Sequence, residues 1–159
     1  GEALEEYKKL MLKLNNEVVA AAPEDLLINT HVCRGNYHST FFSSGAYDSV
    51  ADLLFGEENV NAYYLEYDDE RSGGFAPLAK VSGDKKVVLG LVTTKTPALE
   101  NKELVINRIH EAAKYVSLDR LYLSPQCGFA SCEIGNKLTE EEQWAKLKLV
   151  KEIAEEVWG

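Results

Sequence analysis

The 159-residue sequence predicts an α/β fold in which short parallel strands alternate with helices. Two observations lead to this prediction. Four short apolar runs recur along the chain, and helical or loop-forming segments separate them. The ends of these runs are spaced by roughly 30 residues, which is close to the length of one βα unit. Strands that alternate with helices in this way are expected to lie parallel in one sheet.

The first third of the chain is expected to contain two helices and one strand. Residues 3–20 are predicted to form an amphipathic helix that ends before Pro23. Residues 26–31 form a short apolar run that is typical of a buried strand. A second helix is expected from about residue 47 to Gly56. The apolar residues that recur at helical spacing are Leu4, Tyr7, Met11, Leu14 and Val18 in the first helix and Tyr47, Val50, Ala51 and Leu54 in the second.

Two further strands are expected in the middle of the chain. Residues 61–66 are rich in aromatic side chains, and residues 86–92 form the most continuous apolar run. The polar segment 67–84 contains several glycines and indicates no clear element. Residues 102–116 are predicted to form a helix whose inward side consists of Val105, Ile109, Ala112 and Val116.

The last strand and helix have clear boundaries in the sequence. Residues 120–123 are predicted to form a strand that stops at Pro125. Thr139, with Glu142 three residues later, has the pattern of a capping box and begins a helix that runs to about residue 157. The residues expected to face inward from this helix are Trp144, Leu147, Ile153 and Val157.

Two architectures accommodate four such units in a single domain over residues 1–159. One is a small doubly wound sheet. The other is half of a (βα)8 barrel, since a complete barrel needs roughly 250 residues. The chain begins with Gly1 rather than Met, which favours a piece of a longer protein.

Composition excludes several classes of function. Lys and Arg total 17 and Asp and Glu total 26, so the formal net charge is −9. An acidic chain repels phosphate backbones, and a nucleic-acid partner is therefore not expected. No run of residues has the pattern of a membrane span or a signal peptide. Three Cys do not suggest a disulfide framework and favour reduced thiols in a cytoplasmic protein.

Reactive side chains follow the expected strands at the points where these strands end. His31 and Cys33 come with the first strand, Glu66 ends the second, and Cys127 follows the fourth. Ligands bind parallel α/β folds at the carboxyl ends of strands, so we expect these side chains to meet at one rim. Two thiolates, an imidazole and a carboxylate form a zinc-binding set. Zinc in such a site can also lower the pKa of a substrate thiol.

These residues also have ordinary interpretations. Cys127 can be a buried packing residue, and Glu66 can pair with Arg71 or Lys80. Cys132 lies beyond the strand end and is interpreted as a thiol outside the site.

Other polar residues are placed outside the metal set. His38 is expected to be a loop residue that forms hydrogen bonds rather than a metal ligand, and His110 to lie on the solvated side of a helix. Arg34 is either a bidentate partner for a substrate carboxylate or an ordinary surface residue. Trp158 is expected to pack against the core.

The motifs resemble those of a known family. His31-Val32-Cys33, Glu66 after its aromatic-rich strand, and Ser124-Pro125-Gln126-Cys127-Gly128 resemble the C-terminal catalytic domain of cobalamin-independent methionine synthases, in particular their shorter single-domain relatives. The similarity extends over nearly all of residues 24–158. It implies the C-terminal half of a (βα)8 barrel with zinc held by His31, Cys33, Glu66 and Cys127. It also implies that a methyl group passes from a methylated folate to the zinc-bound thiolate of homocysteine.

The sequence departs from this family in two respects. The family's barrel is about twice as long, so its N-terminal half, which contributes much of the substrate site, is missing here. The long synthases also place a His before a Ser-Pro after the third of these strands, whereas this chain has Lys95 before Thr96-Pro97. Lys95 is the expected catalytic residue, which can hold an anionic group or donate a proton. The identity of the methyl donor stays open.

Two other functions fit the same residues. One is alkyl transfer to a different thiol, for which the same four ligands would serve. The other is a zinc-binding or interaction module without activity. A half barrel exposes two sheet edges that must be covered, which predicts a homodimer or a complex with the missing N-terminal half-barrel.

Overall fold

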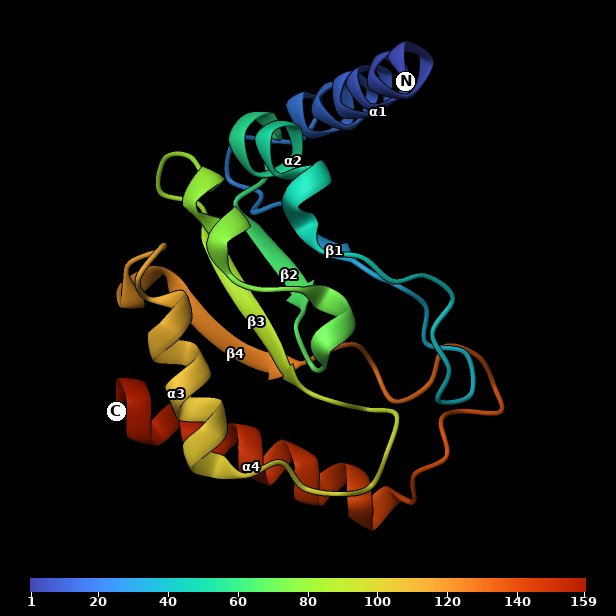
Figure 1. The fold of residues 1–159 in the computed structure, drawn as a ribbon, viewed down its shortest axis with the longest axis vertical. Coiled ribbons are helices and arrows are strands. Elements are labelled where there is room, and N and C mark those ends of the chain that lie inside the picture. The colour runs from blue at the N-terminus through green and yellow to red at the C-terminus, as the bar shows by residue number, and fades with distance from the viewer.

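The computed structural model describes residues 1–159 and contains one parallel sheet with helices packed against it (Figure 1). Its elements, with 3-10 helices labelled η, follow in the order α1 (Glu2–Ala20), β1 (Asn29–Val32), η1 (Tyr47–Ser49), α2 (Ala51–Glu57), β2 (Ala62–Glu66), η2 (Glu70–Ser72), η3 (Ala76–Lys80), β3 (Lys86–Val92), α3 (Lys102–Ala112), η4 (Leu118–Arg120), β4 (Leu121–Pro125) and α4 (Glu140–Trp158). None of these helices combines the length and apolar character needed to cross a bilayer.

The order of the strands decides between the two expected architectures. All neighbouring strands are parallel, and they lie in the order β1-β2-β3-β4. Spatial order therefore follows chain order without a reversal. A doubly wound sheet contains a point where the order reverses, whereas a barrel places each strand beside the preceding one. The sheet is thus of the barrel type, and its four strands make up half of a (βα)8 barrel.

The hydrophobic core lies between the helices and one face of the sheet. Because side chains alternate along a strand, every second strand residue points to this face. A cluster of 21 buried residues joins the two layers. It includes Tyr63, Leu65, Val87, Leu89 and Leu121 from the strands and Phe55, Val105, Ile109, Leu149 and Ile153 from the helices.

The opposite face of the sheet is more open. His31, Tyr64, Val88 and Tyr122 are register neighbours across the four strands. Tyr64 is 39% exposed and Tyr122 is 43% exposed. In a complete barrel this face would be the packed interior, so this chain leaves an interior surface uncovered.

The first strand begins later than the sequence predicted. Residues 26–31 were expected to form it, but Leu26 and Leu27 are 53% and 73% exposed and precede β1. The Leu26 N–H donates to the Pro23 carbonyl, which closes a turn at the start of this apolar run. An apolar run alone does not distinguish a turn from the strand that follows it.

The last helix faces the core with Ile153 and Val157, as predicted, but not with Trp144. Its capping box at Thr139 and Glu142 is confirmed, but the prediction for Trp144 is wrong, because its indole is 60% exposed and donates to Glu140. Lys146, which was not predicted to face inward, is as fully buried as Ile153 and forms a salt bridge of 3.0 Å with Glu100. A prediction that assigns only apolar residues to the buried side of a helix leaves out a lysine whose charge is paired inside the protein.

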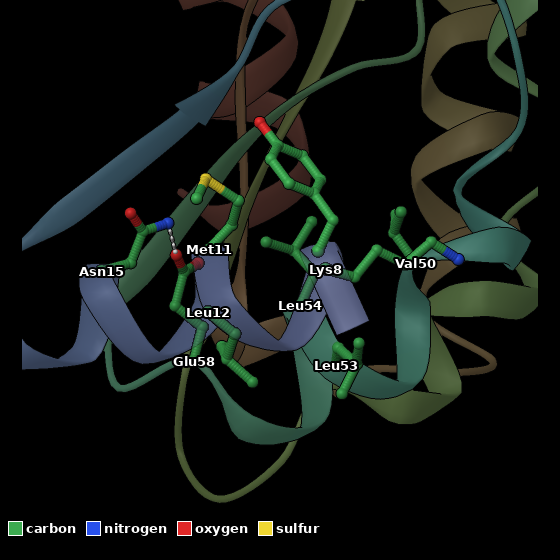
Figure 2. A pocket seen from close by; sticks show the side chains of 9 residues that line it. Lys8, Met11, Leu12, Asn15, Val50, Leu53, Leu54 and Glu58 are labelled. Atoms are coloured by element: carbon green, nitrogen blue, oxygen red, sulfur yellow. Dashed lines mark hydrogen bonds between the residues drawn. The ribbon is translucent and has the colours of Figure 1, made fainter. Parts of the chain in front are cut away.

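Helix α1 is confirmed, but its apolar stripe is not part of the core, since none of its residues is buried. On one side it contacts α2, where the Asn15 amide donates to Glu58 (Figure 2). A groove of about 250 Å³ lies there, lined mainly by apolar residues of α1 and of residues 50–58. This groove contains none of the predicted metal ligands.

Two segments in the middle of the chain contain shorter helices than a regular βα unit or the sequence pattern would suggest. Residues 67–84 contain the short helices η2 and η3, so the crossover from β2 to β3 lacks an α-helix. The helix predicted over residues 102–116 ends at Ala112, but Val116 is still buried in the core.

Gly90 in β3 is required because β2 and the chain at the end of β4 both approach it closely. A Cβ atom there would lie 2.6 Å from the Leu65 carbonyl oxygen and 2.7 Å from the Gln126 Cα. Gly90→Ala should therefore lower the free energy of unfolding by about 1–3 kcal/mol in urea denaturation, because backbone must move. Gly74→Ala is the control, since no atom lies within 4 Å of its Cβ position. Equal stabilities of the two variants would contradict this role for Gly90.

Candidate metal centre

The four residues predicted as ligands come together at the carboxyl ends of the strands. The ligand atoms of His31, Cys33, Glu66 and Cys127 all lie within 4.8 Å of one another. The sulfur atoms of Cys33 and Cys127 are 3.9 Å apart, and His31 Nε2 lies 4.0 Å from Glu66 Oε1. Two sulfur ligands of a tetrahedral zinc ion lie about 3.8 Å apart. The two thiols therefore already have the spacing of a shared metal.

The strand register explains this convergence. His31 and Cys33 are two residues apart in an extended segment, so their side chains point to the same face. Tyr64 pairs with His31, which places Glu66 beside Cys33. The next register neighbour of Glu66 is Gly90, and beyond it lies Ser124 of β4. Glycine adds no side chain between Glu66 and the end of β4, where Cys127 follows.

A backbone hydrogen bond orients His31. Its Nδ1 lies 3.0 Å from the carbonyl oxygen of Tyr64, a pure acceptor, so Nδ1 carries the proton and donates. Nε2 is the ring nitrogen that remains for a metal, and it faces Glu66 Oε1. Metal-binding histidines are commonly oriented in this way by a carbonyl on the far side of the ring.

The carboxylate of Glu66 has one satisfied and one unsatisfied oxygen. Oε2 accepts the Arg34 backbone N–H at 3.2 Å and lies 3.7 Å from Arg71 Nη2. Oε1 is buried and has no hydrogen-bond partner, although Glu66 is completely inaccessible to solvent. Buried polar atoms are rarely left unpaired, and a cation between Oε1 and His31 would satisfy this one. The donor set thus fits a zinc ion.

Arg34 is buried next to Glu66 and helps to fix its position. Both roles predicted for Arg34 are therefore wrong. It is 7% exposed, so it is neither a surface residue nor free for a substrate. Its guanidinium donates to the Tyr47 hydroxyl at 2.7 Å and to the Gly45 carbonyl. The Tyr47 hydroxyl in turn accepts the Glu66 N–H at 3.0 Å. Burial raises the pKa of Tyr47, which keeps this hydroxyl protonated.

Lys95 follows β3 and belongs to the same rim. Its Nζ is buried and has no hydrogen-bond partner. Burial lowers the pKa of Lys95, while the negative charges of Asp68 and Glu66 act in the opposite direction. The side chain therefore offers an unpaired donor close to the acidic part of the cluster.

The remaining candidates have simpler roles. Of the two predicted partners of Glu66, Arg71 approaches it, whereas Lys80 pairs with Asp52 at 2.7 Å. Cys132 is outside the cluster. His38 Nδ1 lies 3.1 Å from a loop carbonyl, His110 is exposed, and Trp158 packs against the core, as predicted.

The sequence did not reveal a second group of polar residues at this rim. Asn36, Thr94, Gln126 and Asn136 are each at most 9% exposed and are hydrogen bonded to one another. Only Gln126 falls inside a recognised motif. The others lie in loops without periodicity, so the pattern of the sequence contains no signal for their burial.

A shallow depression gives access to the cluster. It has a volume of about 260 Å³ and opens on the uncovered face of the sheet. Its lining residues are His31, Tyr64, Ser124, Pro125, Gln126, Cys127 and Gly128. Two of the four candidate ligands are thus reachable from the side that would be a barrel interior.

The fold and the cluster define a barrel-type α/β protein with a mixed thiolate, imidazole and carboxylate site, and comparisons with known proteins agree. Residues 12–156 match the model of the family described as "Cobalamin-independent synthase, Catalytic domain". This chain therefore belongs to the family of cobalamin-independent synthase catalytic domains, a methionine synthase-like class of methyltransferases.

Individual relatives show how much of the family's barrel is represented. YxjG of Bacillus subtilis, described as uncharacterized, is 54% identical over 159 residues, which cover 99% of this chain and 42% of that protein. A methionine synthase of Pyrococcus horikoshii is 29% identical over 101 residues, covering 64% and 26%. The chain thus spans about two fifths of the length of YxjG.

Solved structures support the same fold. A Listeria monocytogenes protein assigned to the vitamin-B12-independent methionine synthases superimposes with a TM-score of 0.74 at 41% identity, covering 96% of this chain and 41% of that one. A B12-independent methionine synthase from Shewanella, solved in complex with selenomethionine, gives a TM-score of 0.72 at 22% identity, covering 92% and 42%.

Removal of one thiol should abolish metal binding. Elemental analysis of the purified chain should find about one zinc ion per molecule, and Cys127→Ala should lose it, because a tetrahedral site would retain only three protein ligands. Cys132→Ala is the matched control, since this thiol lies outside the cluster. Equal zinc contents in the two variants would contradict the assignment of Cys127.

Proposed function

We propose that this chain is the zinc-binding part of an enzyme that transfers a methyl group from a methylated folate-type donor to the thiol of homocysteine, which yields methionine. The observation that carries the proposal is the convergence of four ligand atoms within 4.8 Å at one rim. Membership of the cobalamin-independent synthase family supports the reaction class. A cytoplasmic location remains a prediction.

His31, Cys33, Glu66 and Cys127 would hold the zinc ion. When bound there, zinc supplies a Lewis acid that favours the thiolate form of a substrate thiol at neutral pH. The protein's part is to fix the ligands before the substrate arrives. The Tyr64 carbonyl orients His31, and Arg34 and Arg71 orient Glu66.

Lys95 is proposed to act on the methyl donor. Its buried, unpaired Nζ can hold an anionic group of the donor or deliver a proton to the donor atom that loses the methyl group. This chain has Lys95 where the long synthases place a His, which also allows a donor other than a methylated folate. Alkyl transfer between other donors and thiols is therefore the second candidate function.

The uncovered sheet face supports a proposal about partners. Tyr64, Val88 and Tyr122 form an apolar row on this face, and β1 and β4 are edge strands. Exposed edges and apolar faces of this kind are usually covered. We expect an N-terminal half-barrel to cover them, with a second copy of this chain as the alternative. The chain alone would bind zinc without catalysing transfer.

A chimera tests the function directly. The matched segment of Bacillus subtilis YxjG would be replaced by this chain, and methionine formation from homocysteine would be measured with several methyl donors. The chimera should be active and the isolated chain inactive, because the donor and amino-acid sites need both halves. Cys127→Ala should lower the chimera's kcat by at least about 100-fold, and Cys132→Ala should leave it within about twofold of the unsubstituted chimera.

Substitutions of Lys95 in the same chimera separate its two proposed roles. Lys95→Met should lower kcat by about 100-fold or more while the zinc content stays at one. Lys95→Arg should restore activity if the charge holds an anion, but not if a proton must be donated. A zinc-loaded chimera that is inactive with every thiol and donor would overturn the proposed function. Full activity of Lys95→Met would remove Lys95 from the mechanism.

A further inference from the structure

Four buried polar residues join three loops next to the candidate metal centre. Asn36 lies after β1, Thr94 after β3, and Gln126 and Asn136 after β4. We refer to these four residues as the amide network. Their side chains are at most 9% exposed, so each hydrogen bond among them is shielded from water.

Asn136 is the centre of this network. Its Nδ2 donates to Asn36 Oδ1 at 3.0 Å and to the Thr94 carbonyl oxygen at 2.8 Å. Its Oδ1 accepts the Ser39 N–H at 3.1 Å. One amide group thus connects the loops after β1 and β3 to its own loop after β4.

The network holds both neighbours of Cys127 in the sequence. Gln126 Oε1 accepts the Thr94 N–H at 2.5 Å, and its Nε2 donates to Thr94 Oγ1 at 3.0 Å. On the other side, Asn36 Nδ2 donates to the Gly128 carbonyl oxygen at 2.6 Å. The backbone that carries the Cys127 sulfur is therefore fixed before and after it.

Asn36 also lies three residues after Cys33. Its contact with Gly128 links the loop that carries one thiol to the loop that carries the other, although 94 residues separate Cys33 from Cys127. The same two loops are thus joined by this hydrogen bond and carry the two sulfur atoms that lie 3.9 Å apart.

We propose that the amide network is a positioning device for the thiol pair, with Asn36 as the residue that sets Cys127 relative to Cys33. The inference rests on the proposed metal site. Pre-set ligands bind a metal more tightly, because no free energy is spent on ordering the loops. A network that only filled space would not require a donor directed at the Gly128 carbonyl.

Asn36→Asp in the full 159-residue chain isolates this contact. The substitution keeps the shape of the side chain and the oxygen that accepts from Asn136, but places an oxygen against the Gly128 carbonyl. The dissociation constant for zinc, measured by competition with a chromogenic chelator, should rise about 10–100-fold. In the cobalt-substituted chain, the thiolate-to-cobalt charge-transfer absorption should weaken or shift.

Asn61→Asp is the matched control. This amide accepts the Ile28 N–H at 2.7 Å at the opposite end of the sheet, and an Asp there keeps the acceptor. Zinc affinity and the cobalt spectrum should stay as in the unsubstituted chain. If Asn36→Asp does not fold, Thr94→Val serves instead, since it removes the hydroxyl that binds Gln126 and should weaken zinc binding about tenfold.

The outcomes separate the two assignments. Normal zinc affinity and an unchanged cobalt spectrum in a folded Asn36→Asp or Thr94→Val chain, with or without a lower melting temperature, would overturn the positioning role alone. Failure of the unsubstituted chain to bind zinc or cobalt would overturn the metal site, and the positioning role with it. A specific loss of affinity in the network variants, but not in Asn61→Asp, would support both.

Discussion

The parallel direction of the four strands is the constraint on which the rest of the structure depends. Because every strand runs the same way, all four carboxyl ends meet at one edge of the sheet. The register sets Glu66 beside the end of β1 and leaves Gly90 as the residue between Glu66 and Ser124. Residues that are 94 positions apart thereby come within 3.9 Å. A reversed strand would remove its ligand from this edge.

The sequence predicted the sheet and the cluster for related reasons. Residues 86–92 could be identified because a strand buried on both faces is a continuous apolar run, and it forms β3 with the same bounds. The four candidate ligands could be proposed because reactive side chains at strand ends share an edge. Both inferences need only local patterns and the rule for parallel folds.

Features that depend on distant partners could not be predicted. Arg34 is buried because Tyr47 and Gly45 accept its hydrogen bonds, and Lys146 because Glu100 pairs with it. The amide network has the same origin, since Asn36 and Asn136 are satisfied by each other. From the sequence, a polar residue in a loop is expected to be exposed to solvent. Only the folded chain shows which hydrogen-bond or ion-pair partners offset the cost of burying it.

The charges at the rim are consistent with the proposed chemistry. Two thiolates and a carboxylate around a divalent ion leave a net charge of about −1, and a substrate thiolate adds another. Arg71 and Lys95 are the positive side chains beside these groups, although Arg71 also pairs with Asp68 and Asp69. The uncovered face of the sheet, with Tyr64 and Tyr122, is where the remainder of a barrel would meet this rim.

X-ray absorption at the zinc K-edge tests the central claim most directly, because it reports the atoms bound to the metal. The purified, zinc-loaded chain is predicted to show two sulfur neighbours at about 2.3 Å and two nitrogen or oxygen neighbours at about 2.0–2.2 Å. A shell made only of nitrogen and oxygen, or one with a single sulfur, would contradict the assignment of Cys33 and Cys127 as joint ligands.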